Sequence, residues 1–194
     1  MGLLRPDRKG ADPHAKPLKL DKTKPAKPAA KPKKQAAAPD PLAAVEAQLN
    51  AYAERGVFRS FSRTVFVKGK AEFRFFWLLD LPFHMTFDTR GGVIAFPKLL
   101  PGIQPASDLE AELKAFLADC ASADRPEHRR LDPARLRIDY VNRGRAATLS
   151  VKILDGDWES ATRKAVHLVN EVFLNFLNAR HPEYMIATFQ LPDE

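Results

Sequence analysis

The chain has very little cysteine and no long apolar segment. Cys120 is its single cysteine in 194 residues, so no disulfide can form within the chain and a disulfide-stapled secreted fold is excluded. Charged residues follow soon after Met1, and no apolar core of a signal peptide is visible. The longest apolar run, Phe75–Leu79, is far too short to span a bilayer. We therefore expect a cytoplasmic protein without a membrane span.

The motifs of common catalytic and nucleotide-binding sites are also missing. The sequence contains no GxxxxGK[ST], GxGxxG, GxSxG, HExxH or CxxC pattern. His167 and Glu171 lie one helical turn apart, which suits a metal ion or a proton, but a solvated helix face is the simpler interpretation. We expect no catalytic residue, metal or cofactor. The alternative is a small enzyme whose site forms only in three dimensions, near His84 or His167.

Basic residues are concentrated at the beginning of the chain. The net charge is +7, and the whole excess lies in residues 1–40, since the remaining residues hold 20 basic and 20 acidic side chains. Residues 1–39 are rich in Lys, Pro and Ala and poor in apolar side chains, which predicts a disordered, extended tail. The tail is either a spacer or a weak arm for nucleic acid or another anionic surface. The lysines of such a polyanion-binding arm are Lys16, Lys19, Lys22, Lys24, Lys27, Lys31, Lys33 and Lys34.

Residues 40–194 show the helix and strand patterns of a single α+β domain. Asp40-Pro41 opens a helix, Ser107 and Glu110 form the capping box of a second, and Asp157 caps a third that ends before His181-Pro182. Strand patterns cover residues 63–68, 71–80, 83–89 and 93–96, and a hairpin lies within residues 136–153. The order is α-β-β-β-β-α-β-β-α. Because the connections are short, we predict a two-layer sandwich of three helices on a mostly antiparallel sheet of five to six strands.

This order of elements resembles that of the type III secretion chaperone fold. The resemblance is topological and covers residues 40–194. It implies a dimeric module that binds other proteins.

The strand pattern over residues 71–80 is apolar on both faces. Phe75 and Trp77 fall on one face, and Phe76 and Leu78 fall on the other. A two-layer sandwich covers only one face, so the second must meet another part of the chain, a second subunit or a protein partner. We therefore predict a non-enzymatic protein-binding or adaptor domain, with a homodimer or partner contact at these four residues. The alternative is a nucleic-acid-associated protein that acts through its basic tail.

Overall fold

The computed structural model describes residues 40–190, apart from the side chains of residues 64–66. This part of the chain contains a six-stranded antiparallel sheet and four α-helices, so the predicted α+β architecture is confirmed. The prediction of three helices was wrong by one, because a short fourth helix follows the long third one.

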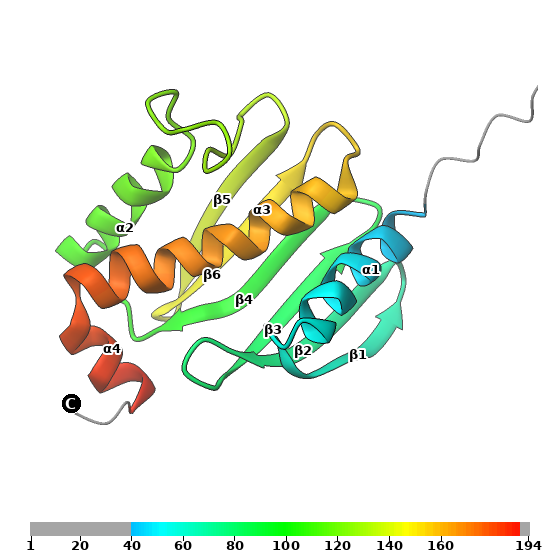
Figure 1. Ribbon diagram of the computed structural model, residues 1–194. Helices are drawn as coiled ribbons and strands as arrows, with labels where there is room; N and C mark the ends of the chain where they lie inside the picture. Colours follow the sequence, from blue (N-terminus) through cyan, green and yellow to red (C-terminus); the bar gives the residue numbers. More distant parts are fainter. Residues whose placement is uncertain (1–39, 191–194) are drawn as a thin grey trace, which may run out of the picture. The chain divides into compact units, whose positions relative to one another are not determined.

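The sheet is built from a four-stranded meander, β1 to β4, and a hairpin, β5 and β6, that pairs with β4 (Figure 1). Its spatial order is β1-β2-β3-β4-β6-β5, and every neighbouring pair is antiparallel. From β4 the chain crosses through helix α2 to the edge strand β5 and returns through β6 to pair with β4. The strands are β1 (Arg59–Val67), β2 (Lys70–Trp77), β3 (Leu81–Asp88), β4 (Val93–Pro101), β5 (Leu136–Arg143) and β6 (Ala146–Ile153).

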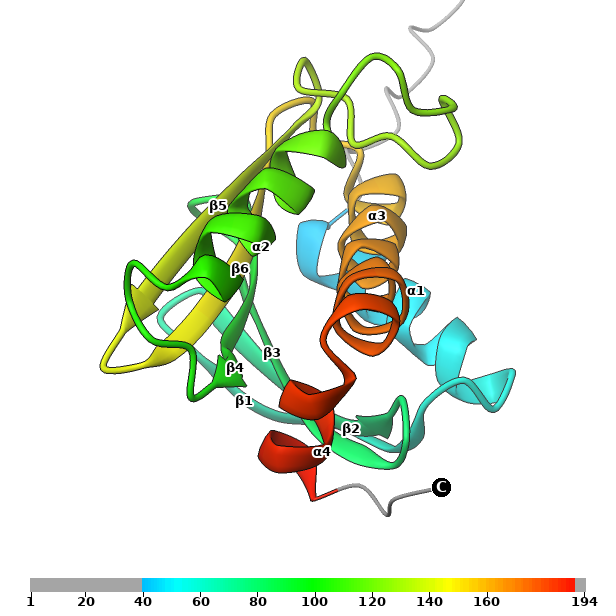
Figure 2. The ribbon, with the colours of Figure 1, turned by 90° about the vertical axis from the view of Figure 1, so that its left-hand side faces the viewer.

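The helices gather on one face of this sheet (Figures 1 and 2). They are α1 (Pro41–Glu54), α2 (Asp108–Asp119), α3 (Trp158–Glu171), its π-helical continuation η1 (Val172–Asn178), and α4 (Pro182–Phe189). Large side chains from both layers fill the space between them, among them the fully buried Phe73, Phe87, Phe96 and Phe176. Within residues 40–190 no helix lies on the opposite face of the sheet. An antiparallel sheet tolerates one solvated face, so two layers, the sheet and the helices on one side of it, are enough to enclose the hydrophobic core.

The predicted helix starts are present. The Asp40 side chain accepts a hydrogen bond from Leu42 N at 3.1 Å, and Ser107 Oγ accepts from Glu110 N at 3.3 Å. The Glu110 carboxylate reaches back to the amide of Ala106, at 2.9 Å, rather than to the amide of Ser107. These contacts satisfy N–H groups that no helical carbonyl can reach.

The fourth helix begins just after the predicted end of the third. His181 ends the long helix, and Pro182 occupies the first turn of α4, where its missing N–H costs nothing. Tyr184 Oη donates to Pro101 O at 2.6 Å, and the Phe189 ring lies 5.6 Å from that of Phe173. The C-terminal segment therefore packs against both layers, as a helix.

Strand β2 ends at Trp77, three residues earlier than predicted. Leu78, Leu79 and Asp80 form a turn with φ angles of 39°, 56° and 60°, and Leu81 N donates to Leu78 O at 3.2 Å. Asp80 forms an ion pair with Arg59 at the start of the neighbouring strand β1. Three successive left-handed residues without glycine are unusual. The buried Trp77 and Phe83 on either side hold the two strands in register and so impose the turn.

Candidate interaction surfaces

Strand β5 forms one edge of the sheet and has a free row of backbone groups. Leu154 N donates to Arg135 O at 2.9 Å, which makes these residues a hydrogen-bonded pair at the start of the β5–β6 ladder. Such pairs alternate along an antiparallel ladder, so the N–H and C=O groups of Ile138 and Tyr140 point away from β6. No backbone hydrogen bond within residues 40–190 reaches them. The edge is therefore a template for another strand.

The opposite edge of the sheet is irregular by comparison. The pairing of β1 with β2 shifts register after Arg59 and again after Arg63, and Ser60 has a φ of 50°. Bulges of this kind twist an edge strand and discourage pairing with another chain. Strand β5 pairs with β6 over eight residues without a register shift. Of the two edges, β5 is the one that is regular enough to add a strand.

The two faces of β5 carry different chemistry. Leu136, Ile138 and Tyr140 point toward the helices and line a largely apolar groove of about 470 Å³ between β5 and α2. Arg137 and Asp139 lie on the helix-free face, and their side chains form an ion pair with a 3.2 Å N–O distance. The strand therefore offers an apolar row on one side and charges of alternating sign on the other.

A buried carboxylate fixes α2 to β5. Glu110 is only 5% exposed and accepts hydrogen bonds from Ala106 N, Lys114 Nζ, Asn142 Nδ2 and Tyr140 Oη at 2.9–3.1 Å. The bond from the Ala106 amide, followed by those from Lys114 and Asn142, lowers the pKa of Glu110 to about 2. Burial and the Glu110 carboxylate raise the pKa of the Tyr140 phenol. This network ties α2 and the loop before it to β5.

A second buried carboxylate anchors the segment that joins α2 to β5. Glu171 is 4% exposed, and its oxygens lie 2.6 Å from Arg129 Nη2, 3.3 Å from Arg125 Nη1 and 2.9 Å from Asn175 Nδ2. Burial by itself raises the pKa of Glu171, but the bonds from Arg129, Asn175 and Arg125 together lower it below the ordinary value of 4.5. His167 Nδ1 is 3.8 Å away, at the limit of an ion pair. Glu171 is thus a charged anchor.

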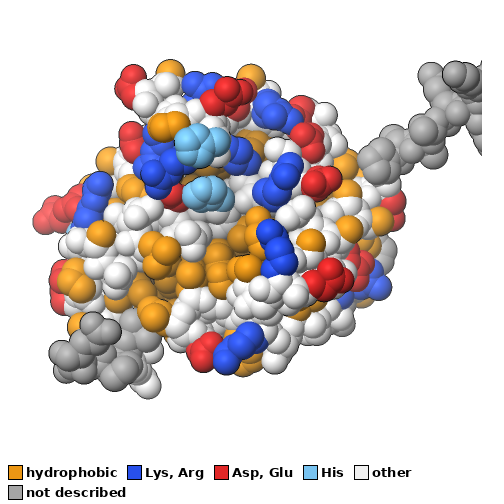
Figure 3. Space-filling model, viewed as in Figure 1, with side chains coloured by type: hydrophobic (Ala, Val, Ile, Leu, Met, Phe, Trp, Pro, Cys, Tyr) orange, Lys and Arg blue, Asp and Glu red, His pale blue; other side chains and the backbone are white. Residues whose placement is uncertain are grey.

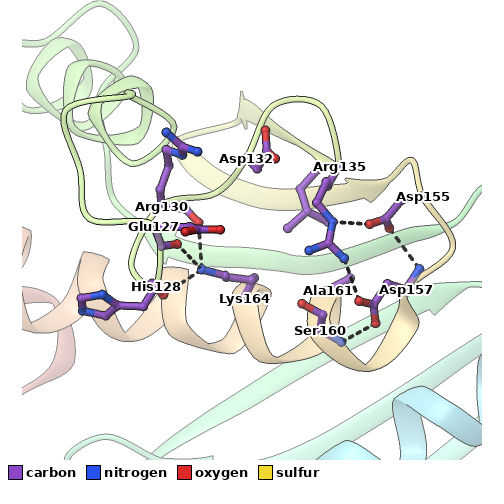
Figure 4. Close-up of a pocket in the computed structure, with 11 residues that line it drawn as sticks. Glu127, His128, Arg130, Asp132, Arg135, Asp155, Asp157, Ser160, Ala161 and Lys164 are labelled. Carbon is purple, nitrogen blue, oxygen red and sulfur yellow. Dashed lines mark hydrogen bonds and ion pairs between the residues drawn. The ribbon is translucent and has the colours of Figure 1, made fainter.

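A hollow of about 490 Å³ beside this segment is lined by charged and polar groups, some of which bond one another (Figure 4), whereas Arg130 Nε is buried without a hydrogen-bond partner. Lys164 Nζ donates to the carbonyls of Glu127, His128 and Arg130 at 3.3, 2.7 and 2.8 Å. Burial lowers the pKa of Lys164, as is common for catalytic lysines, but these three bonds occupy all of its N–H donors. The Arg135 guanidinium lies between the carboxylates of Asp155 and Asp157 and bonds both. These bonds tie the α2–β5 loop to α3 and to the turn before it, while the side chains of Asp132 and Ser160 also line the hollow.

The residues singled out from the sequence are placed in different parts of the fold. Phe75 and Trp77 are buried in the core under the helices. Phe76 stands on the helix-free face, 42% exposed, whereas Leu78 lies in the β2–β3 turn and packs against the core. Their role in protein contact stays a prediction.

The two candidate histidines lie apart. His84 is on the helix-free face of the sheet, 3.5 Å from Glu72, and His167 is on α3. Within residues 40–190 no cluster of three or more His, Cys, Asp or Glu side chains has metal-binding geometry. In the same range no helix is long and apolar enough to cross a membrane. The lysines from Lys16 to Lys34 lie outside the described residues.

Comparison with known protein families, with curated proteins and with solved structures found no match. The sequence did not indicate that Arg137, Ile138 and Asp139 lie on an edge strand. Their alternating pattern predicted a half-buried strand, but no local signal tells which strand of a sheet has an unpaired edge.

Proposed function

We propose that residues 40–190 form a non-enzymatic protein-binding domain that assembles through the free edge of β5, with a second copy of the chain as partner. The observation that supports this proposal is the regular, unpaired edge, whose side chains are complementary to themselves. In the neighbouring hollow, Lys164 and Arg135 are both engaged in internal bonds, which favours binding over catalysis.

The self-complementarity follows from the register of an antiparallel pair. Residues whose backbone groups point outward must lie opposite one another. If two copies of β5 meet at a two-fold axis through Ile138, Arg137 of each copy lies opposite Asp139 of the other. On the helix side, Leu136 lies opposite Tyr140, and Ile138 meets its own copy. Opposite charges and apolar pairs directly across a ladder each stabilise the pairing.

The neighbouring registers lack this complementarity. An axis through Asp139 places the two Asp139 carboxylates opposite each other, and an axis through Arg137 places the two guanidinium groups opposite each other. Like charges directly opposite destabilise a ladder. A two-fold contact uses the same patch on both copies, so one favourable register is enough to close a dimer.

The basic tail adds a separate, weaker affinity in this proposal. Residues 1–40 carry eleven basic and four acidic side chains, and spaced lysines release counterions when they meet a polyanion. Deletion of residues 1–39 is expected to abolish salt-dependent retention on single-stranded DNA without changing the oligomeric state. If the domain alone retains that binding, the tail is a spacer.

The test is the molar mass of the full chain by light scattering over a dilution series. We expect twice the chain mass of 21.7 kDa at high concentration. Ile138→Pro removes an N–H that points away from β6, so it blocks an added strand while leaving the β5–β6 ladder intact. Asp139→Arg places like charges opposite each other in the partner strand. Both variants are expected to be monomeric at concentrations where the parent is a dimer.

A charge exchange provides the matched control. The double variant Arg137→Asp with Asp139→Arg restores opposite charges across the axis and is expected to recover the dimer. Phe76→Ser tests the helix-free face and is expected to leave the mass unchanged. A parent chain that stays monomeric throughout contradicts the proposal, and so does a dimer that resists Ile138→Pro but dissociates with Phe76→Ser.

A further inference from the structure

A second groove lies between α1 and α3, on the helical side of the domain. Its volume is about 550 Å³, and its floor is formed by apolar side chains from α1, β2, α3 and the turn after α1, namely Tyr52, Trp77, Val166 and Val57. Val57 is apolar, yet its side chain is 38% exposed. Trp77 is the last residue of strand β2. Figure 3 shows apolar side chains on this face next to a group of cationic and histidine side chains.

Cations lie beside this apolar floor. Arg163 and Lys164 extend from α3, and the Arg55 guanidinium stacks 4.8 Å from the centre of the Tyr52 ring at the end of α1. Arg163 is 55% exposed, and its carboxylate neighbour Glu159 is 3.9 Å away, at the limit of an ion pair. The imidazole of His128 also lines the groove and makes no hydrogen bond or ion pair with residues 40–190. Arg163 therefore keeps most of its charge available to a ligand.

We infer that this groove binds an acidic amphipathic helix of a partner protein. The apolar floor fits the apolar stripe of such a helix, and the surrounding cations fit acidic residues beside that stripe. The walls are helices, whose backbone groups are already bonded internally. A segment in this groove finds no strand edge to pair with, so it must satisfy its own backbone groups, which a helix does.

The charge around the groove favours an acidic helix over the basic residues 1–39 of the chain itself. Residues 1–39 are basic, so they are repelled by the cations around the groove. The inference goes beyond the proposed assembly through β5, because the groove shares no residue with that edge. A dimer formed at β5 presents two such grooves, which is the arrangement of an adaptor.

The experiment measures the binding of labelled synthetic peptides to the full chain by fluorescence anisotropy. The first peptide is an amphipathic helix with a Leu/Phe stripe and Glu on the remaining face. The second has the same charge but Ser in place of the apolar stripe, so it reports attraction by the basic tail alone. The third carries Lys in place of Glu. We expect the first peptide to bind at least about tenfold more tightly than either of the others.

Variants locate the binding site. Arg163→Glu and Val57→Asp are expected to reduce the affinity for the first peptide to that for the Ser peptide. Arg90→Glu makes the same charge change on the β3–β4 turn, outside the groove, and is expected to have little effect. Ile138→Pro is also expected to leave the affinity per chain unchanged, which separates this inference from the assembly at β5. Equal binding of the acidic and Ser peptides, or equal losses from Arg163→Glu and Arg90→Glu, overturns it.

Discussion

The buried carboxylate of Glu171 provides a sharp test of how the α2–β5 segment is held. Glu171→Gln keeps the shape of the side chain but removes its charge. The amide oxygen of the substituted side chain still accepts one hydrogen bond, while its NH₂ group opposes the donors Arg129 and Arg125. Arg125 keeps its bond to Asp119 at 2.8 Å, so the guanidinium is not left without a partner.

The expected cost follows from the contacts that are lost. A hydrogen bond to a charged group contributes about 1.5–3 kcal/mol. Only the 2.6 Å contact between Glu171 and Arg129 is short. Because the Arg129 side chain is 44% exposed, water can replace part of the hydrogen bonding that Arg129 loses. We therefore expect Glu171→Gln to lower the free energy of unfolding by about 2 kcal/mol at pH 7. In a domain of this size, that corresponds to a fall in Tm of roughly 4–8 °C.

The difference should also depend on pH in a defined direction. The pKa of Glu171 is lower in the folded chain than its ordinary value of 4.5, so its contribution to stability is complete above pH 4.5. That contribution is lost as the pH falls from 4.5 through the lowered folded pKa. Because Gln does not titrate, the stability difference between the parent and Glu171→Gln should shrink over this range.

Urea unfolding of both proteins at pH 7 and at steps below pH 4.5 measures these effects. Glu159→Gln is the control, because Glu159 lies on the same helix but its side chain is 63% exposed. That variant should stay within about 0.5 kcal/mol of the parent. If Glu171→Gln is as stable as Glu159→Gln at pH 7, or if its deficit persists unchanged in acid, the carboxylate does not act as a charged anchor.

Two further predictions concern single residues. Burial raises the pKa of Cys120 to about 11, so its thiolate fraction at pH 8 is roughly a hundredfold below that of a free thiol, and a disulfide reagent should modify it slowly until urea unfolds the chain. Rapid modification of the native protein would show that the thiol is accessible. Leu79 has a φ of 56° and is 60% exposed, so Leu79→Gly should relieve strain and raise the free energy of unfolding by about 0.5 kcal/mol. Leu174→Gly, at a similarly exposed helical position, should instead lower it by about 1 kcal/mol, and equal losses from both variants would argue against strain in the turn.

The sequence by itself determined the local structure of the domain. Asp40, Ser107 and Asp157 predicted three helix starts, because short polar side chains next to an apolar periodic run satisfy the first N–H groups of a helix. The alternation from Leu136 to Tyr140 predicted a half-buried strand for the same kind of reason. Short connections between successive patterns then favoured an antiparallel sheet. These features depend on residues that are close together in the sequence, so they can be predicted from a single sequence.

Prediction from local sequence patterns was wrong at the turn Leu78–Asp80 and at the fourth helix. The apolar run through Leu79 continues the pattern of a strand, yet the chain reverses there because Trp77 and Phe83 are drawn into one core. Pro182 ended the predicted third helix correctly but also began another one, whose place is fixed by contacts with Pro101 and Phe173. Burial across distant segments overrode the local preference in both places.

Only the tertiary structure decided which surfaces remain for a partner. The position of β5 at the edge results from β6 pairing with β4, about fifty residues away in the chain. The groove between α1 and α3 likewise joins Tyr52 to Arg163, and the burial of Glu171 depends on arginines more than forty residues before it. Strand pairing and burial between such distant residues cannot be recognised from the sequence, because the hydrophobic pattern of each segment reports only its own secondary structure. The chain's residues fix its elements, and their packing fixes which backbone edge and which side chains stay open.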